Sequence, residues 1–274
     1  QYRTDNIVSA LTNAFNISGP VYMVPAACAG GNYAVGLGKR LLEWDEADIV
    51  IAGGVDVFSR VAFTGFQRLL SLSPDMCRPF DKDRKGLVIG EGCGIVIMER
   101  ASSAKARKAR ILGELAGVGL TSDRFHMTAP HPQGDGAIKA MDQAIKGAGI
   151  SPSDINYISA HGTGTAANDK IEVKALEMVF GSSKIPPLSS IKSMIGHPMG
   201  AAGAIELIAS LLMLEKNTMI PTANYSTPDP ECNIDCVPNI SRKANLDCIL
   251  SNSFGFGGQS SSIIIKRGKN DGQQ

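Results

Sequence analysis

The sequence predicts an α/β protein built from two similar halves, and three observations carry that prediction. A chain of 274 residues can bury a large core, either as one big domain or as two fused ones. A hydrophobic content of 43% together with 30 glycines is typical of an α/β protein rich in tight turns. Short β-branched runs alternate along the chain with helical patterns, which indicates repeated βα units.

The predicted strands are short runs that end in glycine or polar residues, and we expect them to be buried on both faces. In chain order they are 21–26, 47–54, 94–100, 155–162 and 261–267. The helical patterns between them lie at roughly 30–43, 136–148, 168–180 and 200–216. The last pattern is apolar around most of its circumference, so we expect this helix to be buried between sheets.

A charged stretch, 99–115, is the predicted junction between the two halves. It lacks β-branched residues at first, and strand character resumes at Ile111. The predicted domains are therefore 1–108, which carries a candidate nucleophile, and 109–268, which carries two candidate histidines. Residues 269–274 form a polar tail.

Charge and cysteine content exclude several classes of function. A formal net charge of +1, with neither a basic stripe nor an acidic tail, argues against a partner such as nucleic acid or a membrane surface. No apolar run is long enough to span a bilayer, and no secretory signal opens the sequence. The six cysteines are scattered, and Cys232 and Cys236 lack further ligands nearby. We therefore expect a reduced, cytoplasmic protein without a metal site.

One cysteine and two histidines stand beyond the ends of predicted strands. Cys28 lies where an apolar run turns sharply into a helix, and His161 and His197 each follow the same strand–turn–helix pattern beside glycines. Taken alone, the cysteine is most often a small buried hydrophobe and each histidine a satisfied structural residue. Loops beyond strand ends are nevertheless where open α/β sheets place their binding sites.

Six blocks of sequence resemble the β-ketoacyl-[acyl carrier protein] synthases, the condensing enzymes of fatty-acid and polyketide assembly. In order they are AACAGG, CRPFDKDRKGLVIGEGCG, HMTAP, AHGTGTAAND with a later glutamate, SIKSMIGHPMGAAG and SNSFGFGGQSSSIII. The resemblance covers about residues 1–267 and is closest to the elongating enzymes. It implies a thiolase-like five-layer αβαβα fold, incomplete at the N-terminus because few residues precede Cys28.

The resemblance implies that Cys28 is the nucleophile and that the backbone N–H groups of Cys28 and Phe256 form the oxyanion hole. The start of helix 30–43 is expected to lower the pKa of the thiol, because the helix dipole favours negative charge there. Phe256 also matches the gating phenylalanine of the family, and the glycines beside it give the backbone freedom to move.

His161 and His197 match the two catalytic histidines, which as neutral donors would stabilise the enolate formed when a malonyl group loses carbon dioxide. Lys192, expected on a strand, and Glu172 match residues that organise charge behind these histidines. Without the resemblance, Glu172 would be interpreted as a solvated carboxylate on a helix face. The implied activity is that of an acyltransferase. It condenses a Cys28-bound acyl group with malonyl-[acyl carrier protein] by a decarboxylative Claisen reaction and yields β-ketoacyl-[acyl carrier protein].

Further matches concern the substrate. Thr128, Thr163 and Thr165 match threonines of the phosphopantetheine channel, and Phe66 matches an aromatic residue of the acyl pocket. No cofactor of its own is implied, because the substrate is carried on the phosphopantetheine of an acyl carrier protein. One departure lies at the gate, where Ser260 replaces the asparagine that braces the gate in the family.

The implied partners are an acyl carrier protein and a second polypeptide that supplies the missing N-terminal half. The family also implies a ketosynthase dimer, either a homodimer or a heterodimer. The main alternative function is a non-catalytic one, as a chain-length-factor-like or scaffolding subunit. Chain length factors typically lack the nucleophile, so Cys28 and the two histidines argue against it. Thiolases and initiating synthases carry Cys-His-Cys or Cys-His-Asn sets instead. The acyl chain length and the choice between fatty-acid and polyketide pathways stay open.

Overall fold

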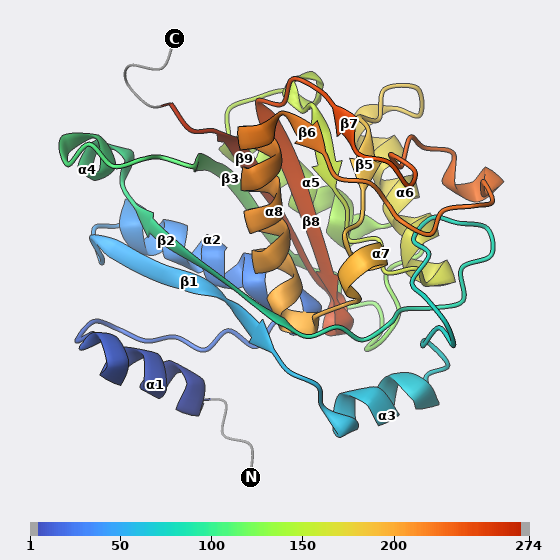
Figure 1. Ribbon diagram of the computed structural model, residues 1–274, viewed down its shortest axis with the longest axis horizontal. Coiled ribbons are helices and arrows are strands. Elements are labelled where there is room, and N and C mark those ends of the chain that lie inside the picture. The colour runs from blue at the N-terminus through green and yellow to red at the C-terminus, as the bar shows by residue number, and fades with distance from the viewer. Residues whose placement is uncertain (1–4, 270–274) are drawn as a thin grey trace.

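The computed structural model describes residues 5–269, and its centre is a mixed sheet of five strands in the order β3-β9-β8-β4-β5 (Figure 1). The strands are β3 Gly113–Ser122, β4 Tyr157–Ser159, β5 Leu188–Ser189, β8 Cys248–Gly255 and β9 Gln259–Arg267. β4 pairs in parallel with β5 and β8, whereas β9 runs antiparallel to both β8 and β3. The predicted strands 155–162 and 261–267 are thereby confirmed.

A second sheet consists of two antiparallel strands, β1 Ile49–Asp56 and β2 Gly92–Glu99. Helices α2 Gly30–Glu43 and α8 Ala202–Lys216 lie between the two sheets and contact both of them. The helices approach closely at Gly31, where a Cβ would lie only 2.6 Å from the Ala204 nitrogen. The expectation that the apolar helix near 200–216 is buried between sheets is confirmed.

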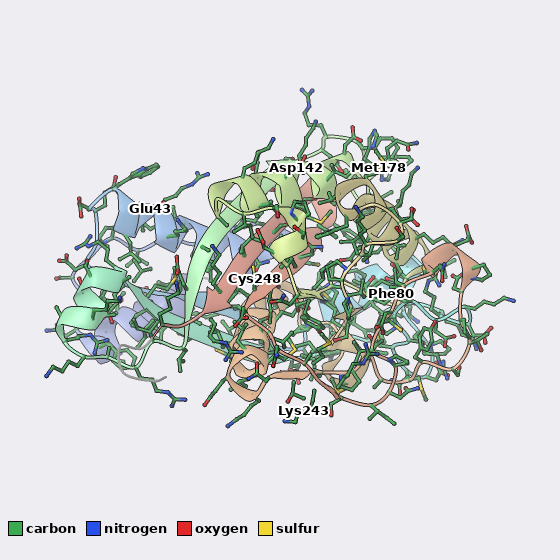
Figure 2. All side chains as sticks on the ribbon, turned by 90° about the horizontal axis from the view of Figure 1, so that it is seen from above. Glu43, Phe80, Asp142, Met178, Lys243 and Cys248 are labelled. Carbon is green, nitrogen blue, oxygen red and sulfur yellow. The ribbon has the colours of Figure 1, made fainter. Side chains whose placement is uncertain are left out.

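The opposite face of the five-stranded sheet is covered by helices α5 Asp135–Gly147 and α6 Ala166–Phe180. Alternation along β3 explains how one sheet serves two layers: Gly119 lies against α5, while the side chain of the adjacent Val118 contacts α2. The described layers are therefore helices, sheet, helices and sheet, and the predicted α/β class is confirmed. Figure 2 shows the filled interior, with Phe80 and Cys248 inside and Lys243 at the surface.

The remaining elements are short or peripheral. The helices are α1 Asp5–Phe15, α3 Arg60–Arg68, α4 Ala101–Ala106 and α7 Lys192–Ile195, and β6 Thr218–Met219 pairs with β7 Arg242–Lys243. Single 3₁₀ turns occur at Ala27–Ala29, Pro152–Asp154, Met199–Ala201, Pro230–Cys232 and Phe256–Gly258. None of the helices between residues 5 and 269 combines the length and apolar character needed to cross a lipid bilayer.

The predicted strand at 21–26 is wrong. These residues have no regular secondary structure, and among the described residues no ladder hydrogen bond joins them to another segment. Val21, Tyr22 and Met23 are correspondingly exposed. A β-branched, aromatic composition favours a strand only where a neighbouring strand supplies backbone partners.

The expectation that every strand is buried on both faces is wrong for β1 and β2. Ile49 and Ile51 of β1 and Ile95 and Ile97 of β2 share one face in the observed register, and all four are exposed. The reason is that the helices α2 and α8 cover only the other face of this sheet within the described residues.

The predicted junction at 99–115 contains α4 and a connector, and the following strand begins at Gly113 rather than Ile111. The predicted polar tail, 269–274, lies outside the described residues except for Lys269.

Candidate active site

Cys28 lies in a sharp turn at the beginning of α2. The 3₁₀ turn Ala27–Ala29 runs directly into the first helical residue, Gly30. Ala27 has a φ of 46°, a left-handed value that residues with a Cβ rarely adopt, so the surrounding structure holds a strained corner. Gly255 packs against it, since a Cβ there would lie 3.1 Å from the Cys28 nitrogen. The sharp turn predicted from the sequence is confirmed.

Burial dominates the chemistry of the Cys28 thiol, of which only 8% is exposed. Burial raises the pKa of Cys28 to about 11. The charge of Lys192 lowers this pKa, the charge of Asp56 raises it, and hydrogen bonds from the backbone N–H groups of Cys28 and Phe256 lower it. The lowering expected from the helix dipole stays a prediction, and the net pKa is raised because desolvation outweighs the groups that favour the thiolate. The thiol is therefore protonated at neutral pH.

The two predicted histidines are neighbours although they come from different loops. His161 follows β4, and His197 precedes the turn Met199–Ala201. Their ring centroids are 5.4 Å apart with the planes nearly perpendicular, and Phe254 packs against His161 at 5.5 Å. Burial, followed by the charge of Lys192, lowers the pKa of both histidines well below its usual value. Both imidazoles are therefore neutral at pH 7, each with one N–H donor and one lone pair.

Lys192 is fully buried behind His161. It begins the short helix α7 and does not lie on a strand as expected, because β5 ends at Ser189. Its Nζ donates a hydrogen bond to the His161 carbonyl oxygen at 2.7 Å and forms an ion pair with Glu206 of α8. Ser253 also donates to Glu206, at 3.3 Å. The sequence analysis did not identify Glu206. A glutamate in an otherwise apolar helix indicates a buried charge that needs a partner, and this pattern could have identified it.

Glu172 lies on α6 and is buried, not solvated. Its two carboxylate oxygens accept hydrogen bonds from the backbone N–H groups of His161 and Gly162, both at 2.8 Å. Burial raises the pKa of Glu172 to about 7, and these two donors act in the opposite direction. Glu172 therefore fixes the backbone of the His161 loop through contacts that do not involve the imidazole ring.

A cavity of about 150 Å³ brings the predicted residues together. The predicted site residues that line it are Cys28, Phe66, Thr128, His161, Thr163, Thr165, Glu172, His197 and Phe256. Lys192 does not line the cavity and acts from behind the histidine loop.

Two features of the lining bear on access to the cavity. The rings of Phe66, from α3, and Phe256 are 5.4 Å apart, so these two predicted aromatics meet at one side. Gly257, next to Phe256, has a φ of 79° and donates from its N–H to the Met127 carbonyl oxygen at 2.8 Å. The segment at Phe256 is thereby joined to the loop that carries Thr128.

Comparisons with known proteins agree with this geometry. Residues 3–104 match the family model described as the N-terminal domain of beta-ketoacyl synthase, and residues 112–226 match the C-terminal domain of the same family. The chain belongs to the β-ketoacyl synthase family.

Curated relatives match most of this chain but are longer. 3-oxoacyl-[acyl-carrier-protein] synthase 2 of Rhizobium meliloti (strain 1021) is 44% identical over 260 residues, which cover 92% of this chain and 62% of the relative. Nodulation protein E of Rhizobium sp. (strain N33) is 39% identical over 256 residues, which cover 93% of this chain and 63% of the relative. The chain thus spans less than two thirds of the length of these relatives.

Solved ketosynthase structures share the fold. The ishigamide ketosynthase/chain length factor gives a TM-score of 0.92 at 41% identity and covers 95% of this chain and 64% of that one. A type II polyketide acyl-carrier protein in complex with its ketosynthase bound to the hexaketide gives 0.92 at 37% identity, with coverages of 95% and 66%. The predicted thiolase-like architecture is confirmed by this agreement.

Proposed function

We propose that this chain carries the catalytic groups of a β-ketoacyl-[acyl carrier protein] synthase, an acyltransferase of fatty-acid or type II polyketide synthesis. One observation carries the proposal: Cys28, His161 and His197, all three buried, line a single cavity. A thiol with two neutral imidazoles provides a nucleophile, a proton acceptor and hydrogen-bond donors in one place.

The first half of the proposed reaction moves an acyl group onto Cys28. The sulfur attacks the thioester carbonyl carbon while the thiol proton passes to a neutral imidazole. The N–H groups of Cys28 and Phe256, which both donate toward the sulfur, stabilise the oxyanion on the same side. The carrier thiolate leaves, takes up the proton, and the acyl group remains on sulfur.

The second half joins the two substrates. The malonyl carboxylate leaves as carbon dioxide, and its electron pair forms an enolate whose oxygen accepts hydrogen bonds from His161 and His197. The enolate carbon attacks the acyl carbonyl, the bond to the Cys28 sulfur breaks, and the sulfur takes up one proton. Each preorganised donor of this kind is typically worth about 3 kcal/mol of activation free energy. Low histidine pKa values keep both groups neutral for this task.

The proposed carrier of both substrates is an acyl carrier protein, with Thr163, Thr165 and Thr128 along the path of its phosphopantetheine. All three line the cavity, and the hydroxyls of Thr163 and Thr165 lie 2.9 Å apart. The solved relative described with an acyl-carrier protein supports this partner. Phe66 is the proposed wall of the acyl pocket, since it meets Phe256 at the cavity.

The two-half organisation stays a prediction, with 1–108 and 109–268 as its parts. The interval between the two family matches, from 104 to 112, supports the boundary.

We also expect further polypeptide, such as a separate N-terminal half, to cover the isoleucines on the outer face of β1 and β2, which form an exposed apolar surface. A ketosynthase dimer and a cytoplasmic location complete the proposal; a solved ketosynthase in complex with its chain length factor supports a heteromeric pair.

Acylation of Cys28 tests the proposed function. The chain, with Cys93→Ser removing the exposed cysteine, is incubated with an acyl thioester of carrier protein and analysed by mass spectrometry. We expect one acyl group, located on Cys28 and absent from Cys28→Ala. A scaffolding or chain-length-factor-like subunit, the alternative function, would bind carrier protein without acylation. Lack of any adduct, with and without a co-expressed N-terminal half, would favour that alternative.

A further inference from the structure

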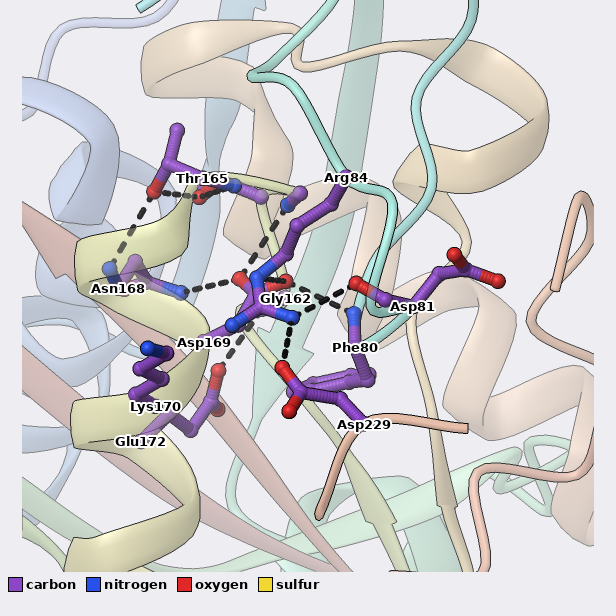
Figure 3. A network of polar contacts seen from close by, with 12 residues as sticks. Phe80, Asp81, Arg84, Gly162, Thr165, Asn168, Asp169, Lys170, Glu172 and Asp229 are labelled. Carbon is purple, nitrogen blue, oxygen red and sulfur yellow. Dashed lines mark hydrogen bonds and ion pairs between the residues drawn. The ribbon is translucent and has the colours of Figure 1, made fainter. Parts of the chain in front are cut away.

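Arg84 is a buried cation behind the candidate pantetheine channel. It lies in the long connection between α3 and β2, and its side chain is only 2% exposed. Figure 3 shows its guanidinium between Asp229, Asp81 and Asp169, which come from three separate segments. Nη1 donates to Asp229 Oδ2 at 2.5 Å and to the Asp81 carbonyl oxygen at 2.7 Å, and Nε lies 3.8 Å from Asp169 Oδ2.

Asp169 connects this cation to the threonine turn. Its carboxylate is fully buried; Oδ2 accepts the Phe80 N–H at 2.8 Å, and Oδ1 accepts the Gly164 N–H at 3.2 Å. Gly164 stands between Thr163 and Thr165 with a φ of 77°, so this hydrogen bond holds the centre of the turn. A buried carboxylate needs a compensating positive charge, which Arg84 supplies.

The connection that carries Arg84 holds the same turn at further points. The Gly86 N–H donates to the Gly164 carbonyl oxygen at 3.0 Å, and the Cys77 thiol donates to the Thr163 carbonyl oxygen at 3.3 Å. The connection is itself fixed by Asp81, whose Oδ2 accepts the backbone N–H groups of Ser226 and Thr227 at 2.6 and 2.7 Å. Arg84 therefore lies where the segments of Asp81, Asp169 and Asp229 meet, beside the turn that carries Thr163 and Thr165.

The groups that hold the histidine loop are a different set. Glu172 and Lys192 bind the backbone of His161, whereas the Arg84 guanidinium contacts Asp81, Asp169 and Asp229. The proposed nucleophile and its oxyanion donors come from the 3₁₀ turn Ala27–Ala29 and the segment at Phe256. Loss of the Arg84 charge should thus disturb the threonine turn more than the reacting groups.

We propose that Arg84 is a positioning residue for the pantetheine arm, acting through Asp169 on the turn that carries Thr163 and Thr165. The inference rests on the proposed function, since it assigns those threonines to the pantetheine of an acyl donor. It predicts that replacing Arg84 weakens acylation of Cys28 more when the acyl donor contains more of the pantetheine arm.

Two acyl donors separate this role from a general structural one. Acylation of Cys28 is measured with an acyl-pantetheine thioester and with an acyl thiophenol thioester, which has no pantetheine arm. In Arg84→Gln we expect the half-saturating concentration of acyl-pantetheine to rise by about tenfold or more, with the thiophenol rate changed by less than about twofold. Arg84→Lys should recover part of the loss, because it restores the charge without the planar guanidinium.

Arg78→Gln is the matched control, because Arg78 lies in the same connection but pairs with the exposed Asp75. If Arg84→Gln fails to fold, Asp229→Asn removes one contact of Arg84 and should give the same selective loss in smaller measure. Equal losses with both donors, or no loss with either, would overturn the positioning role while the proposed function stands. A parent chain acylated by neither donor, nor by an acyl thioester of carrier protein with or without a co-expressed N-terminal half, would instead overturn the proposed function, and this inference with it.

Discussion

Ile97 of β2 and Ile263 of β9 lie in equally β-branched runs, yet 72% of Ile97 is exposed and Ile263 is fully buried. The difference lies in what covers each sheet. β9 has α5 on one face and α2 and α8 on the other, whereas β2, within residues 5–269, has α2 and α8 on one face and an exposed opposite face. A strand of the same composition is therefore a core element in one sheet and a surface element in the other.

The two regions also contribute different parts of the candidate active site. His161, His197, Glu172 and Lys192 lie around the five-stranded sheet, and Glu206, the partner of Lys192, extends toward it from α8; all five are buried. Cys28 belongs to the start of α2, the layer that both sheets share. The difference teaches that the burial of the proposed acid–base groups depends on a closed core, while the position of the proposed nucleophile depends on the contact between the two regions.

Truncating one isoleucine in each sheet gives the largest expected difference between the regions. Ile263→Ala should lower the free energy of unfolding by about 2–5 kcal/mol, because it leaves a cavity in a closed core. Ile97→Ala should change it by less than about 0.5 kcal/mol, because its side chain is already exposed to solvent. Urea unfolding of both variants, followed by circular dichroism, makes the measurement. Equal losses would mean that the β1–β2 face is covered in the protein as purified.

Removing either histidine tests the chemistry assigned to the buried region. We expect His161→Ala and His197→Ala each to slow carbon dioxide release from a malonyl thioester by about 10²–10³-fold, because each removes one enolate donor. Acylation of Cys28 should fall less, since the remaining imidazole can still accept the thiol proton and the backbone N–H groups still stabilise the oxyanion. Release of carbon dioxide and acyl-enzyme formation are measured in parallel on the same preparations. A variant that decarboxylates at the parental rate would refute the role of its histidine.

The raised pKa of Glu172 predicts a pH dependence of stability. Because burial raises this pKa to about 7, the folded state binds a proton that the unfolded state releases near pH 4.3, so this contribution to stability falls as pH rises toward 7. The low pKa values of His161 and His197 act in the opposite sense, since their contribution is lost as pH falls below about 6.5.

Comparing the parent with Glu172→Gln isolates the carboxyl group from the histidines. Between pH 5 and pH 7, we expect the free energy of unfolding of Glu172→Gln to fall less than that of the parent, or to rise. Urea unfolding at pH 5, 6 and 7 makes the measurement. Glu177→Gln changes a glutamate of the same helix and is the matched control. Identical profiles for the parent and Glu172→Gln would contradict the pKa assigned to Glu172.

The two regions also offer two contrasting thiols, one exposed and one buried. Cys93 of β2 is exposed, so iodoacetamide should modify it without loss of acyl transfer. In Cys93→Ser, the alkylation rate of Cys28 should rise by about tenfold per pH unit from pH 7 to 10, because its thiolate is scarce below a pKa of about 11. Mass spectrometry of timed samples provides the rates. A plateau near pH 8 would show that the thiol is less buried than described.

Local patterns predicted much of the fold and most of the site. The bounds of α2 agree with the predicted helix 30–43, because apolar spacing and the cysteine turn are properties of adjacent residues. Cys28, His161 and His197 stood out for a similar reason: each follows an apolar run and precedes glycines and a helix. The resemblance to a family then gave these residues roles that spacing alone left open.

Only the tertiary structure decided the burial and the partners of these groups. The pKa of Cys28 depends on Lys192 and Asp56, which are distant from it in the chain. The ion pair of Lys192 with Glu206 and the contact of Arg84 with Asp229 likewise join separate segments. The segment 21–26 and the outer face of β1 and β2 were misjudged for the same reason. Composition predicts that a residue can pair or be buried, but desolvation and hydrogen bonding depend on which distant segment packs against it.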